Sequence, residues 1–297
     1  MIEKNIKDDF LDLFYNDLCD EALENNSTLN LFTLKVRNNA FTYDELISEL
    51  GNKLCYFALS RKQVDELKRE DKFNDLVKKA KAKLKHHADN EGELGEILLY
   101  CLLESHLNAP KILTKLELKT NSNDYVKGAD GVHLLKLTDT DYQIVLGESK
   151  LNSDISKGVY EAFGSIKKFL ESTSKLEFEI DLINSELVKE AYDQTTYDML
   201  KKIIIPSAKE DETYLDYSFG MFLGFDIPIT EEESKLTNMD FRKSIREKIK
   251  KEVLKAKNSL NKQLQKSDYK GYQFYIYVIP FSDLQNKRKH IIEKIVE

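Results

Sequence analysis

Residues 128–151, GADGVHLLKLTDTDYQIVLGESKL, constrain the fold more than any other stretch of the chain. Two apolar runs flank the polar break TDTD at 138–141, which is typical of a hairpin turn. The second run, residues 143–151, is largely apolar on both faces, as expected for a strand in the centre of a sheet. The pattern therefore predicts two paired strands, the second of them buried.

Charged side chains stand at the ends of these two runs. Asp130 begins the first run, and Glu148 and Lys150 close the second. Side chains two residues apart on a strand point to the same face, so Glu148 and Lys150 project together. Pairing of the runs would bring Asp130 near them. Two carboxylates and an ammonium at one place suit a divalent metal and a phosphodiester.

The expected chemistry follows from these residue types. Mg²⁺ prefers oxygen ligands, so Asp130 and Glu148 can anchor it, with Mn²⁺ as a substitute and the backbone carbonyl of Ser149 as a third ligand. A bound metal lowers the pKa of water and neutralises charge on the scissile phosphate. We expect Lys150 to hold or help deprotonate the attacking water and to stabilise the oxyanion.

An acidic helix is predicted before the hairpin. Residues 91–107 carry an apolar stripe at helical spacing, formed by Leu94, Ile97, Leu98, Cys101 and Leu102. Glu93 and Glu96 fall together beside this stripe. We expect Glu96 to orient a water or join a second metal site, with Glu93 as the competing choice.

Each candidate also has a purely structural interpretation. Glu148 and Lys150 could form an exposed salt pair worth ~0–1 kcal/mol. Asp130 could be a turn residue of GADG. Glu93 and Glu96 could be solvated helix acids. His133, within the first strand, is expected to pack rather than to bind a ligand, so we do not include it in the candidate site.

Helices and strands alternate over the rest of the chain. After the helix at 91–107 we expect a strand at 111–120, the hairpin, and then further elements at 152–171 (helix), 185–203 (mixed helical), 217–227 (strand), 231–264 (helix) and 272–281 (strand). Strands that alternate with helices after an initial meander predict an α/β fold, with a mixed β-sheet flanked by helices.

The first 85 residues are predicted to form an N-terminal α/β lobe. The spacing predicts a helix within 5–24, a strand at 29–36, a helix that begins after Thr42 with Glu45 completing a capping box, a short strand at CYFAL (55–59), and helix over 61–85. This lobe contains no constellation of catalytic residue types. We interpret it as a possible partner-binding unit.

Charge and composition exclude some classes. The net charge of −7 excludes a simple polyanion binder. The lysine-rich segments 78–87 and 242–270 are either solvated helix faces or phosphate-contacting surfaces. Residues 1–12 lack a secretory pattern, and ILLYCLL (97–103) is too short to cross a bilayer, so we expect a cytoplasmic protein.

The cysteines also favour a cytoplasmic protein. Cys19, Cys55 and Cys101 are scattered and show no Cys/His cluster at zinc spacing. We expect all three to be buried thiols in a reducing cytosol.

The order Glu96, Asp130, Glu148-Ser149-Lys150 resembles the PD-(D/E)xK nuclease superfamily, whose fold is restriction-endonuclease-like. The Gly92-x-x-x-Glu96 pattern is similar to the helix glutamate of several branches. No Pro precedes Asp130, a departure that the superfamily tolerates. The resemblance implies that lysines on the next helix touch phosphate, and in this chain these would be Lys157, Lys167 and Lys168; the alternative is that they are plain surface residues.

Three stretches, GELGEILLYCLLE, GADGVHLL and LGESK, resemble the HamA family, the nuclease-like subunits of the Hachiman anti-phage defence systems. This resemblance covers residues 86–170 well. It implies a PD-(D/E)xK nuclease domain over 86–297, DNA as substrate and a helicase partner called HamB. In that family the helicase is thought to restrain the nuclease until phage DNA processing releases it.

These observations support a metal-dependent DNA nuclease acting as an immune effector. One alternative is a nuclease-fold module that binds nucleic acid or a partner without cleaving. Such a module would bind DNA equally well with Asp130 or Lys150 replaced, and would yield no products. A stand-alone restriction-type endonuclease is the third hypothesis, and discrete cleavage fragments would favour it.

Overall fold

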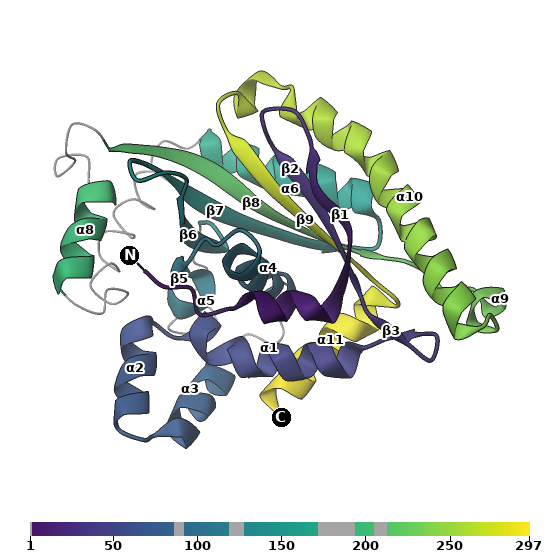
Figure 1. Ribbon diagram of the computed structural model, residues 1–297, viewed down its shortest axis with the longest axis horizontal. Coiled ribbons are helices and arrows are strands. Elements are labelled where there is room, and N and C mark those ends of the chain that lie inside the picture. The colour runs from purple at the N-terminus through teal and green to yellow at the C-terminus, as the bar shows by residue number, and fades with distance from the viewer. Residues whose placement is uncertain (1, 86–91, 119–127, 172–193, 205–212) are drawn as a thin grey trace.

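The computed structural model describes residues 2–85, 92–118, 128–171, 194–204 and 213–297. A seven-stranded sheet in the order β1-β2-β9-β8-β7-β6-β5 lies at its centre, with helices on both faces (Figure 1). The strands of this sheet are β1 (Phe14–Ala22), β2 (Thr28–Leu34), β5 (Lys111–Thr114), β6 (Gly131–Lys136), β7 (Asp141–Asn152), β8 (Tyr214–Asp226) and β9 (Gln273–Phe281). A separate ribbon pairs β3 (Val36–Arg37) with β4 (Ala40–Phe41).

The described helices connect and cover these strands. They are η1 (Asp8–Leu13), α1 (Tyr43–Ala58), α2 (Arg61–Arg69), α3 (Phe73–Lys85), α4 (Glu93–Ser105), α5 (Lys115–Leu118), α6 (Ile155–Leu170), α8 (Gln194–Ile204), α9 (Glu231–Ser234), α10 (Asn238–Leu264), η3 (Ser267–Tyr269) and α11 (Leu284–Val296). No helix among the described residues is both long and apolar enough to cross a membrane.

The sheet is mixed, as the sequence predicts. The four central strands β2, β9, β8 and β7 run parallel, and antiparallel pairs complete both edges. The predicted hairpin is confirmed: β6 pairs with β7 from Val132↔Leu146 to Lys136↔Tyr142, with TDTD in the turn. β7 pairs with β8 along its whole length, which makes it a central strand.

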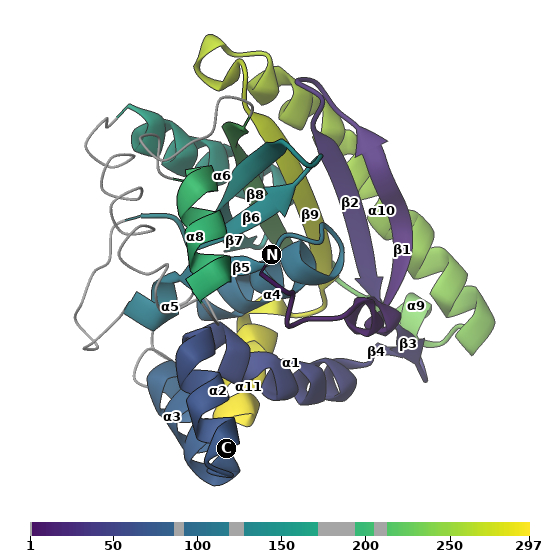
Figure 2. The same cartoon turned by 60° about the vertical axis from the view of Figure 1, so that its left-hand side comes forward.

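Two helical layers enclose the sheet. α4 packs on β7 and β8 from one face, and α1 and α11 pack against α4. On the opposite face α6 covers β7 and β8, and α10 lies behind β1 and β2 beside α6 (Figure 2). The resulting α/β fold, a mixed sheet flanked by helices, agrees with the prediction from the order of elements.

Helix α4 is buried over its whole length, because it lies between the sheet and other helices. Two glycines let it approach the sheet closely. A Cβ at Gly220 on β8 would lie 2.9 Å from the Leu103 side chain, and a Cβ at Gly95 would lie 3.1 Å from Ser149 on β7. These contacts fix the helix against the two longest strands of the sheet.

A buried charged network joins α4 to the N-terminal part of the chain. The Glu104 carboxylate accepts hydrogen bonds from the backbone N–H groups of Ile6 (2.8 Å) and Lys111 (2.9 Å), and lies 3.4 Å from the Arg61 guanidinium. Both charged side chains of this pair are almost fully buried, at 2% exposure for Arg61 and 0% for Glu104. The Lys111 ammonium is equally buried and contacts Glu117 at 2.9 Å.

Several predictions for the N-terminal part are wrong. Residues 14–22 form strand β1 rather than helix, because β2 supplies a hydrogen-bonding partner and two bulges in β1 hide the strand alternation. CYFAL lies in the last turns of α1, where Leu50, Leu54 and Phe57 continue one buried face. α1 begins after Thr42 as predicted, but the Thr42 hydroxyl donates to the Lys35 carbonyl instead of forming the capping box.

Other boundaries also differ from the predictions. The charged helix of 231–264 is two helices, α9 and α10, and α11 was not predicted. Much of the mixed helical stretch 185–203 lies outside the described residues, which contain α8 from Gln194. The division into a lobe over 1–85 and a domain over 86–297 stays a prediction. The central sheet contains strands from both sides of that boundary.

We expect Glu104→Ala to lower the free energy of unfolding by about 3–5 kcal/mol, because it removes the buried carboxylate that pairs with the Arg61 guanidinium and accepts from backbone N–H groups. Asp8→Asn is the control, since it removes an acid whose side chain is 76% exposed. Chemical denaturation of both variants measures the difference. Equal stability of the two variants would contradict the assigned role of this network.

Candidate active site

Asp130 is held at the start of β6 by backbone and side-chain bonds to β7. Its N–H donates to the Gly147 carbonyl at 2.9 Å. Its carboxylate oxygen Oδ2 accepts from the Ser149 N–H at 2.8 Å and from the Ser149 hydroxyl at 2.9 Å. Asp130 thus extends the hairpin in a fixed orientation, and its other oxygen, Oδ1, faces the Lys115 ammonium at 3.3 Å.

Glu148 and Lys150 lie on one face of β7, as their spacing predicts. The Lys150 ammonium contacts the Glu148 carboxylate at 2.5 Å. The alternative interpretation, an exposed salt pair, does not hold. The Glu148 side chain is only 15% exposed and that of Lys150 is 26% exposed. An ion pair in this setting carries a desolvation cost that a surface pair does not.

Glu148 lies in a largely buried setting beside a second acid, Asp130. Burial and the nearby charge of Asp130 raise the pKa of Glu148 above its ordinary value, although Lys150 and Ser165 act in the opposite direction. Burial also opposes the charge on Lys150, yet Glu148 and Asp130 outweigh it and raise the pKa of Lys150. Lys150 is therefore an ammonium at neutral pH, and the two acids repel each other.

Lys115 is a site residue that the sequence reasoning missed. Its ammonium lies 3.3 Å from Asp130 and 3.9 Å from the Glu96 carboxylate, so it joins the two acids. Burial opposes its charge, but Asp130, Glu96 and Glu148 together raise the pKa of Lys115 above its ordinary value. The residue is the first of α5, in a segment predicted to be strand.

A local signal for this turn is present in the sequence. Thr114 and Glu117 have the Thr-x-x-Glu spacing of a capping box. The Glu117 N–H donates to the Thr114 hydroxyl at 3.2 Å, and the Thr114 N–H donates to the Glu117 carboxylate at 3.1 Å. The predicted strand therefore ends at Thr114, and the chain turns back so that Lys115 faces Asp130.

The two helix acids occupy the first turn of α4. Glu93 is 1% exposed and Glu96 is 6% exposed, so the alternative of solvated acids is wrong for both. The close approach of Gly95 to Ser149 brings this turn against β7. The Lys115 ammonium contacts both Glu96 and Asp130. Glu96 is therefore close to the candidate active site, although it is distant from Asp130 in the sequence.

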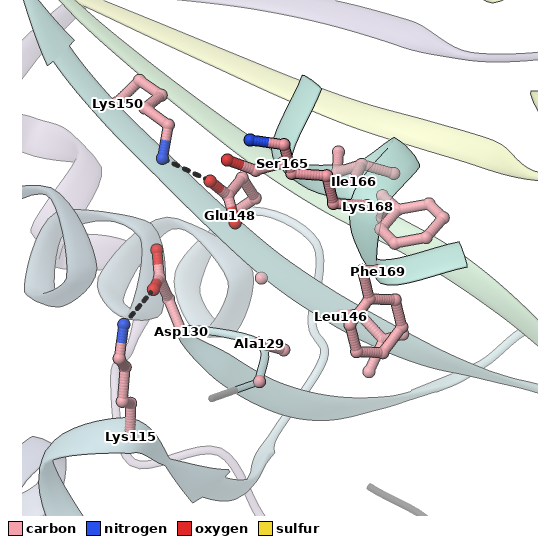
Figure 3. Close-up of a pocket in the computed structure, with 13 residues that line it drawn as sticks. Lys115, Ala129, Asp130, Leu146, Glu148, Lys150, Ser165, Ile166, Lys168 and Phe169 are labelled. Atoms are coloured by element: carbon pink, nitrogen blue, oxygen red, sulfur yellow. Dashed lines mark hydrogen bonds and ion pairs between the residues drawn. The ribbon is translucent and has the colours of Figure 1, made fainter. Parts of the chain in front are cut away.

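Asp130, Glu148, Lys150 and Lys115 open onto one pocket of about 380 Å³ (Figure 3). Helix α6 forms its other wall, from which Ser165, Ile166, Lys168 and Phe169 face the hairpin. The structure therefore brings together the three principal residues predicted from the hairpin.

The three lysines that were predicted to contact DNA differ in their positions relative to the pocket. Lys168 lines the pocket. Lys157 pairs with Glu161 at 3.7 Å, and Lys167 pairs with Asp268 at 3.0 Å. The described parts of the lysine-rich segments 78–87 and 242–270 contribute no residue to the pocket lining.

Other predictions for reactive side chains have mixed outcomes. His133 is buried and bonds through Nδ1 to the Ala109 carbonyl at 2.8 Å, and burial lowers the pKa of His133 to about 4, so its packing role is confirmed. Cys101 is buried as predicted, but Cys55 is only half-buried and Cys19 is exposed. The prediction was wrong for Cys19 because β1 is the edge strand of the sheet.

The fold and the pocket define an α/β protein with paired acids and lysines at the open end of a central hairpin. A comparison with protein families gives a more specific result: the family model described as HamA matches residues 8–295 of the 297-residue chain. The chain belongs to the HamA family, and this membership supports assigning it to the Hachiman defence systems. No curated protein matches the chain.

We expect Glu148→Gln to stabilise the metal-free protein at neutral pH. A raised pKa means that the folded state disfavours the charged carboxylate relative to the unfolded chain. The resulting penalty is complete above the folded pKa and vanishes as the pH falls below the ordinary value of 4.5. The stability gain of the variant should therefore disappear on acidification.

Urea denaturation in the presence of EDTA from pH 4 to pH 8 measures this difference. Glu252→Gln is a control for loss of one acid, since Glu252 lies on the exposed side of α10. A Glu148→Gln variant that is less stable than wild type at pH 8 would contradict the assigned electrostatics.

Proposed function

We propose that this protein is a metal-dependent nuclease that hydrolyses phosphodiester bonds in DNA, as an effector of anti-phage defence with a HamB-type helicase partner. The observation that carries the proposal is the convergence of Asp130, Glu148 and Lys150 on one pocket. Family membership supports the defence role. The substrate, the reaction and the partner are inferences from these two findings.

The arrangement of elements favours a PD-(D/E)xK core. α4 precedes the hairpin and carries Glu96, β6 begins directly after Asp130, and β7 carries Glu148 and Lys150 at its end. β7 then pairs in parallel with β8, with α6 between them in sequence. This order agrees with the resemblance of the motif to that superfamily.

The donor set fits a hard divalent cation. Asp130 and Glu148 supply carboxylate oxygens, and oxygen-only sites suit Mg²⁺ and Mn²⁺. The raised pKa of Glu148 indicates that added positive charge would be favourable there. The N–H of Ser149 points to Asp130, and the C=O of a strand residue lies on the same edge as its N–H. The Ser149 carbonyl can therefore serve as a third ligand.

When bound, Mg²⁺ would supply charge neutralisation at the phosphate and polarise the attacking water. The residues of the chain prepare the site for this chemistry. Ser149 holds Asp130 in one orientation through two hydrogen bonds. Lys150 keeps its proton because Glu148 and Asp130 raise its pKa. Its role is then to stabilise negative charge on the reacting phosphate by a fixed ammonium.

Contact with the DNA backbone requires positive charge near the pocket, despite the net charge of −7. Lys168 lines the pocket on α6 and is the first candidate for this contact. Lys157 and Lys167 lie on the same helix and are secondary candidates, because they are not part of the pocket lining. Contacts of this kind position DNA without reading its sequence.

We expect Glu148→Gln and Lys150→Gln each to reduce DNA cleavage by about 100-fold or more, because each removes a charge at the reacting phosphate. The assay measures loss of plasmid and linear DNA with Mg²⁺ and with EDTA, both for the protein alone and with its helicase partner. Including the partner ensures that an inactive isolated subunit is not mistaken for an inactive enzyme.

The matched controls are Lys136→Gln and Asp139→Asn. These residues form a similar ion pair at the turn end of the same hairpin, far along the strands from the pocket. Both control variants should cleave DNA as wild type does. Cleavage that survives Glu148→Gln, or that proceeds undiminished in EDTA, would contradict the proposal.

Metal binding can be tested without DNA. A cation that binds only the folded protein raises the midpoint of thermal unfolding. We expect Mg²⁺ and Mn²⁺ to raise this midpoint for wild type and for Asp139→Asn, but not for Asp130→Asn. An equal rise for wild type and Asp130→Asn would place the cation elsewhere.

One observation favours a second candidate, a nuclease-fold module that binds without cleaving. The Lys115 ammonium already lies between Asp130 and Glu96, so these two acids are neutralised in part without a metal. If Lys115 permanently replaces a cation, Lys115→Met should increase affinity for Mn²⁺ while wild type shows neither Mn²⁺ binding nor cleavage. Metal binding by wild type would exclude this candidate.

A further inference from the structure

A second group of potential metal ligands lies at the opposite end of α4 from the pocket. Cys19, Asp20 and His106 each place one ligand atom so that these atoms lie within 4.8 Å of one another. His106 is the C-cap of α4, whereas Glu96 is in the first turn of that helix. His106 is ten positions after Glu96, which corresponds to a rise of about 15 Å along the helix axis. The group is therefore distinct from the candidate active site.

The backbone of β1 is distorted at the point where its two ligands occur. Adjacent side chains on a regular strand point to opposite faces, so Cys19 and Asp20 would normally diverge. Here the register with β2 shifts between Leu18 and Glu21, and Asp20 adopts a left-handed φ of 46°. This bulge brings both side chains towards His106. Asp is one of the few residues besides glycine that adopt this conformation readily.

Two fully buried polar side chains hold the ligand residues in place. Asn30 uses both ends of its amide: its oxygen accepts from the Asp20 N–H at 2.9 Å, and its nitrogen donates to the Asp20 carboxylate at 3.2 Å. The Tyr277 hydroxyl lies 3.3 Å from Nδ1 of His106. Both Asn30 and Tyr277 are 0% exposed.

These outer contacts have the form found around metal sites. Metal-bound histidines are commonly oriented by a hydrogen bond to the other ring nitrogen, and ligating carboxylates are themselves hydrogen-bonded. The rings of Phe32 and Tyr277 also pack edge-on against the His106 imidazole, with centroids 5.4 and 5.6 Å away. Asn30 and Tyr277 thus orient Asp20 and His106 before any ion arrives.

We propose that Cys19, Asp20 and His106 form a zinc site that ties the edge strand β1 to the end of α4. A thiolate, a carboxylate and an imidazole are a donor set that suits Zn²⁺, with water in the fourth position. A thiolate and a carboxylate also balance the charge of the ion. The ligand atoms of a tetrahedral zinc ion are roughly 3.3–3.8 Å apart. The ligand atoms of Cys19, Asp20 and His106 therefore need to move about 1 Å closer together to coordinate zinc.

The site could not be recognised from spacing in the sequence. Its ligands come from β1 and from the end of α4, which the fold brings together. Zinc would hold an edge strand that is paired on one side only. The inference concerns a site of stability and does not depend on the proposed nuclease activity.

Cobalt substitution of the full-length, reduced and metal-stripped protein tests this site. Co²⁺ bound by a thiolate gives a charge-transfer absorption in the near ultraviolet, which oxygen-only ligands do not give. We expect wild type to bind one Co²⁺ with this band, and Zn²⁺ to displace it. Cys19→Ser should abolish the band, and His106→Gln should weaken Zn²⁺ binding at least about tenfold.

Two controls make the assignment specific. Cys55→Ser removes another cysteine that is at least partly accessible, and Glu148→Gln alters the acidic pocket; both should keep the band. Circular dichroism checks that all variants are folded, and Zn²⁺ should raise the unfolding midpoint of wild type more than that of Cys19→Ser. The absence of the band in wild type, or its persistence in Cys19→Ser, would overturn the proposal.

Discussion

The close packing of α4 on β7 and β8 is the contact on which the rest of the structure depends. Glycines at positions 95 and 220 favour it, because a Cβ would lie 3.1 Å from Ser149 and 2.9 Å from the Leu103 side chain. Burial of an entire helix gives its polar residues a fixed environment. The first turn places Glu96 beside Lys115 of the pocket, Glu104 anchors the N-terminal part of the chain, and His106 lies near Cys19 and Asp20 of β1.

The candidate active site concentrates charge that the fold only partly compensates. Asp130, Glu148 and Glu96 converge with Lys115 and Lys150, and burial together with the charge of Asp130 raises the pKa of Glu148. Strongly perturbed ionisable groups in a pocket often indicate function, because stability alone would favour their removal. By contrast, the Glu104 carboxylate accepts hydrogen bonds from three backbone N–H groups and pairs with a guanidinium, so its role is to stabilise the fold.

The sequence was most informative where one local pattern determined one structure. The alternation of side chains along the β6–β7 hairpin predicted that Asp130, Glu148 and Lys150 converge. The apolar stripe in residues 91–107 predicted α4. Prediction failed where distant partners decided the outcome: β1 is a strand because β2 pairs with it, and its bulges obscure the alternation. Lys115 was missed because alternation in 111–120 was read as a longer strand, although the Thr114–Glu117 capping box marks its end.

The proposed catalysis requires Asp130 and Glu148 to bind a divalent cation together. The sharpest test is a crystal of the wild-type protein soaked in Mn²⁺, in which the anomalous scattering of manganese locates the ion. We expect a peak in contact with both carboxylates and the Ser149 carbonyl, with the Lys115 ammonium displaced from Asp130. A pocket without a peak, in which Lys115 still pairs with Asp130, would contradict it.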